Sequence, residues 1–200
     1  MAATCVNIAL HHLAKIEEVD LVISGPNYGR NVSSSLCMSS GTIGGAHEAS
    51  LCGKKAVAVS FALYSEEGYQ EEDVLRGCRI AAGVIRDLVE SWPSEVHIFN
   101  INVPVFSGMP DTLEVYQTYI FQNPSGSMFK LQQATEDGPR SFRFRPDPSR
   151  FFSASPPLGS DAWAIKNKHV SVTPLLASFS EVQGTRAFVS TFKVAQGSSL

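Results

Sequence analysis

Three short apolar segments, each separated from the next by a stretch of helical character, most strongly limit how this chain can fold. The segments are 20–24, 55–61 and 97–102, and each has the length and the apolar content of a buried strand. Helical stretches are expected between them at 40–51 and 71–91. Strands that alternate with helices fold as a parallel sheet with crossover helices. We therefore expect an α/β fold with a mostly parallel, Rossmann-like sheet.

The regions that flank this repeated pattern are less regular. Apolar residues recur at helical spacing near the start, which predicts an amphipathic helix over 4–17. Residues 25–38 are rich in Gly, Asn and Ser and are expected to form a loop. Two further strands are expected at 113–121 and 169–174, whereas helix and strand both remain possible from Leu175 onward.

Residues 123–160 are rich in Pro, Gly, Ser and Arg, and they also carry five phenylalanines. We interpret them as β-hairpins or an extended arm, and a mobile surface insertion is the alternative. So many aromatic side chains favour burial against a partner subunit. We expect one domain over 1–200, with an α/β core at 1–104 and a β-rich arm and return strand at 105–170. The phenylalanines are Phe129, Phe142, Phe144, Phe151 and Phe152.

The composition excludes several classes of protein. The hydrophobic content of 44% is that of a globular chain, and the net charge of −3 comes with no basic run, so a nucleic-acid polymer is not an expected partner. No apolar run reaches the roughly 18 residues that a membrane span needs. The four cysteines are scattered without a C-x-x-C pair, which favours reduced thiols and a cytoplasmic protein. They are Cys5, Cys37, Cys52 and Cys78.

Two polar stretches are the main candidates for a site. The first, 24–31, directly follows a strand, and its Asn27 and Asn31 offer neutral groups to a hard cation or a phosphate. A turn built from Asn and Gly would use the same residues. The second, Ser40-Gly41-Thr42, stands where a helix begins and could bind an anion through exposed amides and hydroxyls. An ordinary helix N-cap is the alternative for this stretch.

Other polar residues are weaker candidates. The neighbouring His11 and His12 could bind a metal, but adjacent residues of a helix point apart, so solvation or packing is favoured. His47 and Glu48 could act as general bases, although surface or packing roles are favoured for them too. Asp161 lies two residues after Gly159 and could equally cap a loop or contact the site.

Taken together, these stretches resemble the SurE family. The family pattern is a strand, then S-G-x-N-x-G-x-N, then S-G-T with a helix of small residues, then A-V-S. Later matches are N-I-N-V-P at 100–104, a G-[ST]-D motif at 159–161 and V-S-V-T-P-L at 170–175. The resemblance is weak between about 108 and 157. The residues that match the earlier motifs, from S-G-x-N-x-G-x-N to A-V-S, are Ser24, Gly25, Asn27, Gly29, Asn31, Ser40-Gly41-Thr42 and Ala58-Val59-Ser60.

This resemblance implies a metal-dependent phosphatase that hydrolyses phosphomonoesters, typically nucleoside monophosphates, with Mg²⁺ or Mn²⁺. Asn27 matches a metal-ligand asparagine of the family, and Asn31, Ser40, Gly41 and Thr42 match positions around the phosphate. The arm is expected to support a homodimer or tetramer.

One departure from the family pattern bears on activity. The family opens with a strand ending in N-D-D-G, whose aspartates bind the metal, and this sequence contains no N-D-D-G. The catalytic residues are therefore unknown, and we expect the domain to be shortened at its N-terminus and to have little or no metal-dependent activity as given. The alternatives are a non-catalytic SurE-like binding or interaction module, or a fragment of a larger fusion protein.

Overall fold

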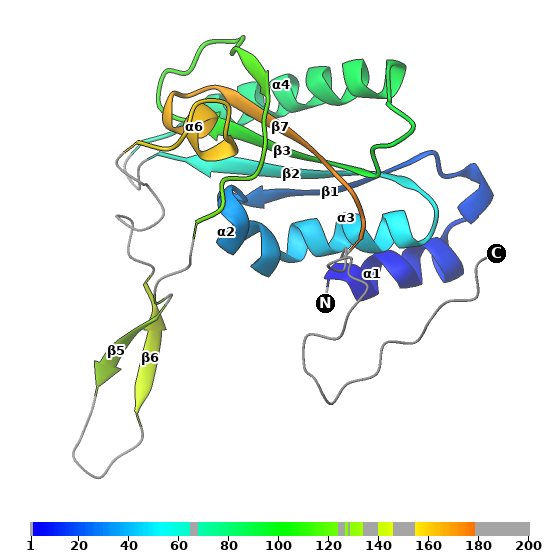
Figure 1. The fold of residues 1–200 in the computed structure, drawn as a ribbon, viewed down its shortest axis with the longest axis horizontal. Coiled ribbons are helices and arrows are strands. Elements are labelled where there is room, and N and C mark those ends of the chain that lie inside the picture. The colour runs from blue at the N-terminus through cyan, green and yellow to red at the C-terminus, as the bar shows by residue number, and fades with distance from the viewer. Residues whose placement is uncertain are drawn as a thin grey trace, which may run out of the picture.

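A five-stranded sheet forms the centre of the computed structural model, which describes residues 2–64, 68–123, 127, 129–133, 140–145 and 155–178. The strands lie in the order β1-β2-β3-β7-β4 (Figure 1). The first three are mutually parallel, β7 is antiparallel to β3, and β4 is parallel to β7. The predicted α/β fold with a mostly parallel sheet is confirmed. The bounds are β1 Leu21–Tyr28, β2 Lys55–Leu63, β3 Ile98–Val105, β4 Val115–Gln117 and β7 Val170–Leu175.

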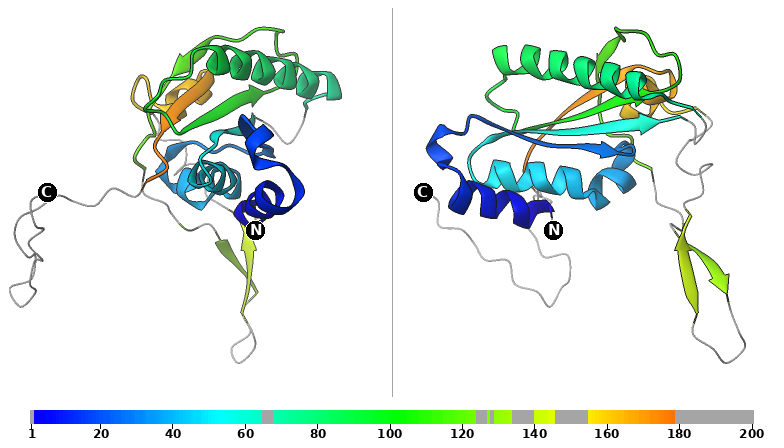
Figure 2. Two further views of the ribbon diagram at one scale, coloured as in Figure 1. Left: turned by 90° about the vertical axis from the view of Figure 1, so that its right-hand side faces the viewer. Right: turned by 180° about the vertical axis from the view of Figure 1, so that it is seen from behind.

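Helices cover both faces of the sheet. Figures 1 and 2 show α4 on one face and the pair α1 and α3 on the other. The main helices are α1 Ala2–Ile8, α2 Ser33–Ser39, α3 Gly41–Leu51, α4 Glu71–Glu90 and α6 Asp161–Lys166. A π-helical turn, η1 Ala9–Leu13, continues α1, and a 3₁₀ turn, η2 Ile16–Glu18, precedes β1. Within the described residues, none of the helices combines the length and the apolar character that crossing a bilayer requires.

Side chains alternate between the two faces of the sheet along β2 and β3, and this alternation gives the sheet two different surfaces. Val57, Val59 and Phe61 pack with β3 and α4 side chains, and Ala56 and Ala58 pack with α3. Successive residues of a strand point to opposite faces, so Ser60, Asn100 and Asn102 share the α3 side of the sheet. That side is apolar where the strands begin and polar where they end.

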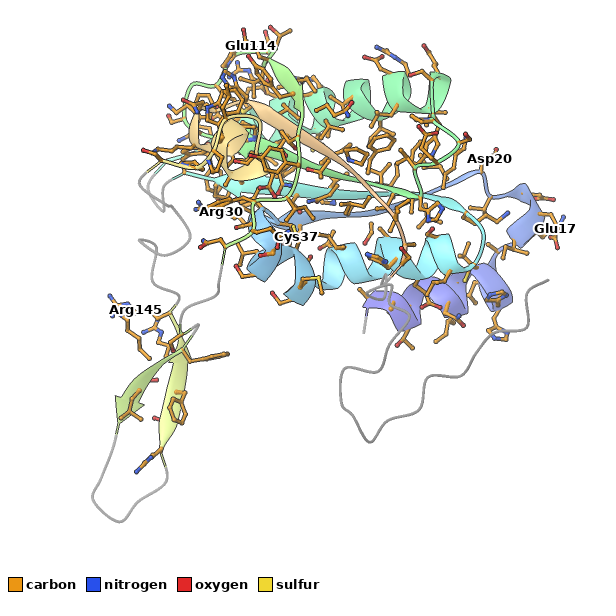
Figure 3. The ribbon with its side chains drawn as sticks, viewed as in Figure 1. Glu17, Asp20, Arg30, Cys37, Glu114 and Arg145 are labelled. Atoms are coloured by element: carbon orange, nitrogen blue, oxygen red, sulfur yellow. The ribbon has the colours of Figure 1, made fainter. Side chains whose placement is uncertain are left out.

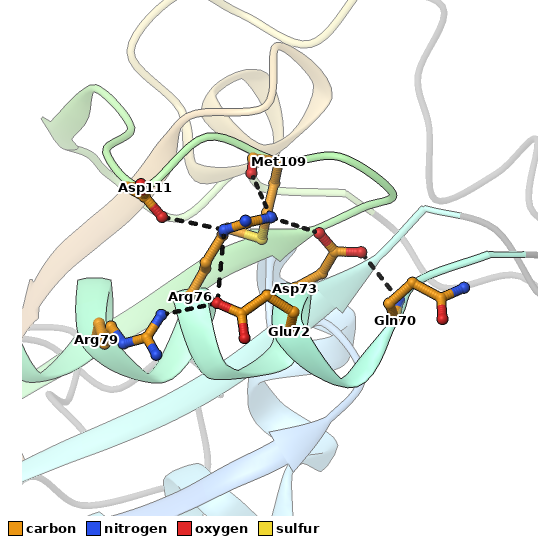
Figure 4. Close-up of polar contacts among 7 residues, drawn as sticks. All are labelled: Gln70, Glu72, Asp73, Arg76, Arg79, Met109 and Asp111. Atoms are coloured by element: carbon orange, nitrogen blue, oxygen red, sulfur yellow. Dashed lines mark hydrogen bonds and ion pairs between the residues drawn. The ribbon is translucent and has the colours of Figure 1, made fainter.

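The start of α4 is tied to the loop that follows β3 (Figure 4). The carboxylate of Asp73 is buried and accepts the N–H of Gln70 at 2.9 Å, which completes a capping box. The guanidinium of Arg76 lies 3.3 Å from the same carboxylate, and it also donates to Asp111 and to the carbonyl of Met109. These contacts fix the connection between β3 and β4 against the helix.

Several predicted boundaries were wrong. The strand expected at 20–24 continues to Tyr28, and the loop expected over 25–38 contains both that extension and α2. The helix expected over 4–17 changes to a π-helical turn at Ala9, and the strand expected at 113–121 is regular only at 115–117. The strand predicted at 169–174 is confirmed as β7. Helix and strand were both possible from Leu175 onward, and most of that segment, 179–200, lies outside the described residues.

The predicted hairpin is present in the described part of the arm. Strands β5 Phe129–Gln133 and β6 Ser141–Phe144 pair in antiparallel fashion and extend away from the core (Figure 1). On one face Leu131 lies opposite Phe142, and on the other Lys130 lies opposite Arg143. Phe151 and Phe152 lie outside the described residues.

A β-bulge near the end of β1 depends on Gly25. Ser24 pairs with Ala58 and Asn27 with Ser60, so β1 has one more residue than β2 across this interval. The φ of Gly25 is +119°, and a Cβ at this position would collide with the carbonyl oxygen of Val59. The extra residue reverses the alternation of side chains in β1, and it thereby places Asn27 on the same side as Ser60.

Gly25→Ala should lower the free energy of unfolding by about 2 kcal/mol or more, because both the backbone angle and the space exclude a side chain. Urea unfolding measures the effect. The matched control is Gly83→Ala in α4, where a Cβ meets no atom within 4 Å and helix propensity predicts a gain of about 0.5–1 kcal/mol. Equal midpoints for the two variants would contradict this account of the bulge.

Candidate functional site

A row of polar side chains crosses the sheet near the carboxyl ends of the parallel strands. Asn27 of β1 is in register with Ser60 of β2, and Ser60 is in register with Asn102 of β3. The row continues to Ser171 of β7. Ligands of open α/β sheets gather at the carboxyl ends of strands. Figure 3 shows Arg30 and Cys37 at this end of the sheet, with Glu17 and Asp20 at the other.

The backbone of Asn31 is held by two buried asparagine side chains of β3. Its N–H donates to Oδ1 of Asn102 at 2.8 Å. Its carbonyl oxygen accepts from Nδ2 of Asn100 at 2.9 Å, from Nδ2 of Asn102 at 3.1 Å and from the thiol of Cys37 at 3.2 Å. The side-chain Nδ2 of Asn31 donates to Ser60 Oγ at 2.8 Å. We call these five residues the asparagine clamp, and it fixes the loop between β1 and α2 over the polar row.

A second buried group, Asp161, fixes the next residues of the same loop. Its Oδ2 accepts the N–H of Ser33 at 2.7 Å, and its Oδ1 accepts the N–H groups of Phe121 at 3.0 Å and Ala162 at 2.7 Å. Ser33 has a φ of 59°, a left-handed conformation that non-glycine residues seldom adopt without support. Asp161 is 0% exposed, and burial raises its pKa although the three N–H groups favour the charged form.

These contacts decide between the two roles that were open for Asp161. Both carboxylate oxygens are occupied by backbone N–H groups, so Asp161 joins α2, the segment after β4 and α6. It therefore acts as a loop clamp in this structure.

The Ser40-Gly41-Thr42 stretch begins α3, as predicted. Ser40 is the N-cap, and its Oγ accepts the N–H of Ile43 at 3.2 Å. The helix then runs close beside β1, because a Cβ on Gly45 would lie 2.7 Å from the Oγ of Ser24. Gly41 is exposed and Thr42 is half-buried. The hydroxyl oxygen of Ser40 therefore acts as an N-cap, as one of the two interpretations predicted. Gly41 and Thr42 lie in the first turn of the helix, which is partly exposed.

Asn27 lies on β1 itself and not in the loop where it was expected. Its Nδ2 donates to the carbonyl of Gly29 at 3.1 Å, which orients the amide group at the end of the strand. Asn31 lies in the following loop and is 5% exposed.

Comparison with known proteins settles the family. The family model described as Survival protein SurE matches residues 1–123, which is more than half of the chain. The chain belongs to the SurE family. The 5'-nucleotidase SurE of Pelobacter propionicus is 30% identical, with 86% of this chain and 65% of the relative covered. The probable tubulin–tyrosine ligase PBY1 of Saccharomyces cerevisiae is 31% identical, with 90% of this chain but 27% of that protein covered.

The solved structure of the SurE protein from Aquifex aeolicus has the same fold. It superposes with a TM-score of 0.68 at 23% identity, covering 90% of this chain and 68% of the other. Among the curated relatives that it matches first, this chain spans between about a quarter and two thirds of the relative's length.

The described residues do not by themselves complete a SurE-type metal site. Asn27 can offer one neutral amide oxygen, whereas Mg²⁺ and Mn²⁺ sites are built mainly from several oxygens that include carboxylates. Within the described ranges, no three His, Cys, Asp or Glu side chains lie close enough together to hold a metal ion. Asp161, whose carboxylate contacts the loop at Ser33, already accepts three N–H groups.

The weaker candidates lie away from the polar row. Glu48 accepts the side-chain N–H of Asn7 at 2.7 Å, so it joins α3 to α1, as the packing interpretation predicted. Burial lowers the pKa of His47 on the same helix. His11 lies 3.5 Å from the thiol of Cys52, and all four cysteines are free. Burial, aided by the charge of Asp161, raises the pKa of Cys37 to about 12, so this thiol serves the clamp as a neutral donor.

The N-I-N motif was identified in the sequence, but the roles of Asn100 and Asn102 in holding the loop were not predicted. The available signal was their spacing, because residues i and i+2 of a strand share one face and polar residues are rare in a fully buried strand. Ser60 carries the same signal in an otherwise apolar segment.

Asp161→Asn should lower the free energy of unfolding by about 2–3 kcal/mol, since an amide puts an N–H against buried N–H donors that the carboxylate now satisfies. The measurement is the urea midpoint at neutral pH. Asp87→Asn is the control, because the Asp87 side chain is 74% exposed and should change stability by less than about 0.5 kcal/mol. A loss below that bound for Asp161→Asn would refute the clamp role.

Proposed function

We propose that this domain belongs to a metal-dependent phosphomonoester hydrolase that acts on nucleoside monophosphates. Membership of the SurE family supports this, and several relatives carry the name 5'-nucleotidase. The observation that carries the proposal is the position of the two asparagines that match the family pattern. Asn27 lies in the polar row at the carboxyl end of β1, and Asn31 lies in the loop that covers this row. We also propose that the protein is cytoplasmic, and its four free cysteines support this location.

In this proposal the residues of the chain position the phosphate. The Gly41 amide and the Thr42 hydroxyl, at the start of an 11-residue helix, offer hydrogen bonds and the positive end of a helix dipole to an anion. Ser40 remains the N-cap through its hydroxyl oxygen and can still donate its hydroxyl proton to the phosphate. The Asn27 amide oxygen would contribute to the Mg²⁺ or Mn²⁺ site, whose cation supplies Lewis acidity when bound. Asn31 holds the intervening loop in place through the clamp.

We propose that the carboxylates for this cation come from a strand that pairs with the free edge of β1. Among the described strands β1 has a partner on one side only, and Ile23 and Tyr28 on it are 52% and 56% exposed. An apolar groove of about 360 Å³ lies between β1 and α4, lined by Ile23, Pro26 and Phe61 with α4 side chains. An open edge beside an apolar groove favours addition of another strand. A parallel strand there would end beside Asn27.

The activity test compares this chain with a form that adds a strand ending in Asn-Asp-Asp-Gly ahead of it. Each is assayed for phosphate release from adenosine monophosphate with Mg²⁺ or Mn²⁺. Metal-dependent turnover is expected only from the extended form, and Asn27→Ala should reduce it at least about 100-fold. Asn7→Ala is the matched control, because Asn7 bonds Glu48 between α1 and α3. Equal turnover from both forms would show that the added carboxylates are not required.

The second candidate is a non-catalytic SurE-like module or a fragment of a larger fusion protein, and one finding favours the fusion. The yeast relative is mostly composed of sequence outside this match, so SurE-like domains occur within larger chains. The ligase name of that relative belongs to a protein of which this match covers 27%. Tight nucleotide binding without turnover in the extended form would support the module.

We also propose that the β5–β6 hairpin joins subunits into a homodimer or tetramer. On one face Phe129, Leu131 and Phe142 are 53%, 51% and 61% exposed, which makes a continuous apolar strip. The opposite face carries Lys130 and Arg143, which keeps that side solvated.

Replacing Phe129, Leu131 and Phe142 together by Ser should convert the oligomer to a monomer, because the strip would lose the apolar surface that drives association. Light scattering at tens of micromolar measures the mass. Lys130→Ser is the control on the opposite face and should leave the mass unchanged. A wild-type chain that is already monomeric at this concentration would rule out the assembly.

A further inference from the structure

A cavity of about 680 Å³ lies at the end of the sheet opposite the polar row. It is bounded by the turn between α3 and β2, by the connection between α4 and β3, and by Ala177 after β7. In Figure 1 these segments meet at the right-hand end of the sheet, where β2 begins and α4 ends. The volume falls in the range of small-molecule sites.

The cavity has a cationic lining. Lys54, Lys55 and His97 line it, and no acidic residue is among the residues that line it. The nearby carboxylate of Glu95 accepts the hydroxyl of the lining residue Ser94 at 3.3 Å. Backbone N–H groups of Cys52, Gly53 and Lys54 already donate to three of the last four carbonyls of α3, so the lysine side chains are not the main cap of that helix. Their charges are therefore available to an anion.

One wall of the cavity is a fixed aromatic ring. The indole N–H of Trp92 donates to the carbonyl of Val96 at 2.7 Å, and its ring packs edge-to-face on Phe99 with centroids 4.7 Å apart. The ammonium of Lys55 lies 5.5 Å from the centre of the Trp92 ring. A rigid ring beside a cation suits a ligand that has both a flat apolar part and a negative charge.

His97 adds a hydrogen-bond donor to the lining. Its Nδ1 accepts the N–H of Ala177 at 3.0 Å, so in the neutral ring the proton is on Nε2. An imidazole N–H can donate to a phosphate or carboxylate oxygen together with the two ammonium groups.

We propose that this cavity is a second ligand site, which binds a small organic anion carrying a flat ring and a phosphate, phosphonate or carboxylate group. The anion lies against Lys54, Lys55 and His97, and the ring lies against Trp92. The site is separate from the polar row, so it neither depends on nor supplies phosphatase activity.

The test follows the fluorescence of Trp92 in Trp163→Phe, which removes the other tryptophan of the chain. Phenylphosphonate is the probe, because it cannot be hydrolysed as a phosphate ester, and no metal is added. A saturable change is expected at millimolar concentration or below, and Lys54→Gln with Lys55→Gln should weaken binding at least tenfold. Lys15→Gln is the control, because Lys15 pairs with Glu18, does not line the cavity and should not alter the curve.

Two further arms separate this site from the proposed phosphatase site. Asn27→Ala should leave the titration unchanged, and inorganic phosphate should bind at least tenfold more weakly than phenylphosphonate, because it has no ring. Loss of the signal in Asn27→Ala would place the probe at the polar row and overturn the assignment. A linear, non-saturating change, or equal curves for the lysine variants and the parent, would overturn it as well. Circular dichroism verifies that each variant is folded.

Discussion

The rest of the site depends on the backbone N–H and carbonyl groups of one residue, Asn31. Its carbonyl oxygen accepts three donors and its N–H has one acceptor, all from side chains that are almost fully buried. A buried backbone group without a partner costs about 1–3 kcal/mol, so the loop could not lie over the sheet without Asn100 and Asn102. Strand β3 pairs on both sides, and it therefore gives these two amides a rigid base. This contact holds the loop between Asn27 and α2 over the sheet.

Asp161, from a distant part of the chain, also holds the backbone of this loop through its buried carboxylate. It lies 128 residues after Ser33 and yet accepts its N–H, so the conformation of the loop depends on α6 and on the segment that follows β4. The cost of burying a carboxylate, seen in its raised pKa, is offset by three N–H groups. Polar side chains from β2, β3 and α6 thus converge on a loop of a few residues, and this convergence leaves the carboxyl edge of the sheet ordered for a ligand.

The sequence predicted the parallel core because periodicity is a local signal: β2, α3, α4 and β3 were found near their true bounds. The features that it missed depend on contacts distant in sequence. The bulge at Gly25 is set by the carbonyl of Val59, and α2 exists where Asp161 holds Ser33. The antiparallel direction of β7 also follows from chain return and not from its residues. At the candidate site, the stretches around Asn27 and Ser40 were singled out from the sequence, and their role stays a prediction. The role of Asn100 and Asn102 became visible only with their hydrogen-bond partners.

Native-state hydrogen exchange of the Asn31 backbone amide tests the central claim most directly. If the asparagine clamp holds this loop as described, the amide should open with a free energy close to that of global unfolding, like the amides of β3. Such protection is unusual for a loop residue, because loop amides normally exchange through small local fluctuations. Exchange of the Asn31 amide at the rate of exposed turns, while the β3 amides stay protected, would contradict the claim that the buried asparagines fix the site.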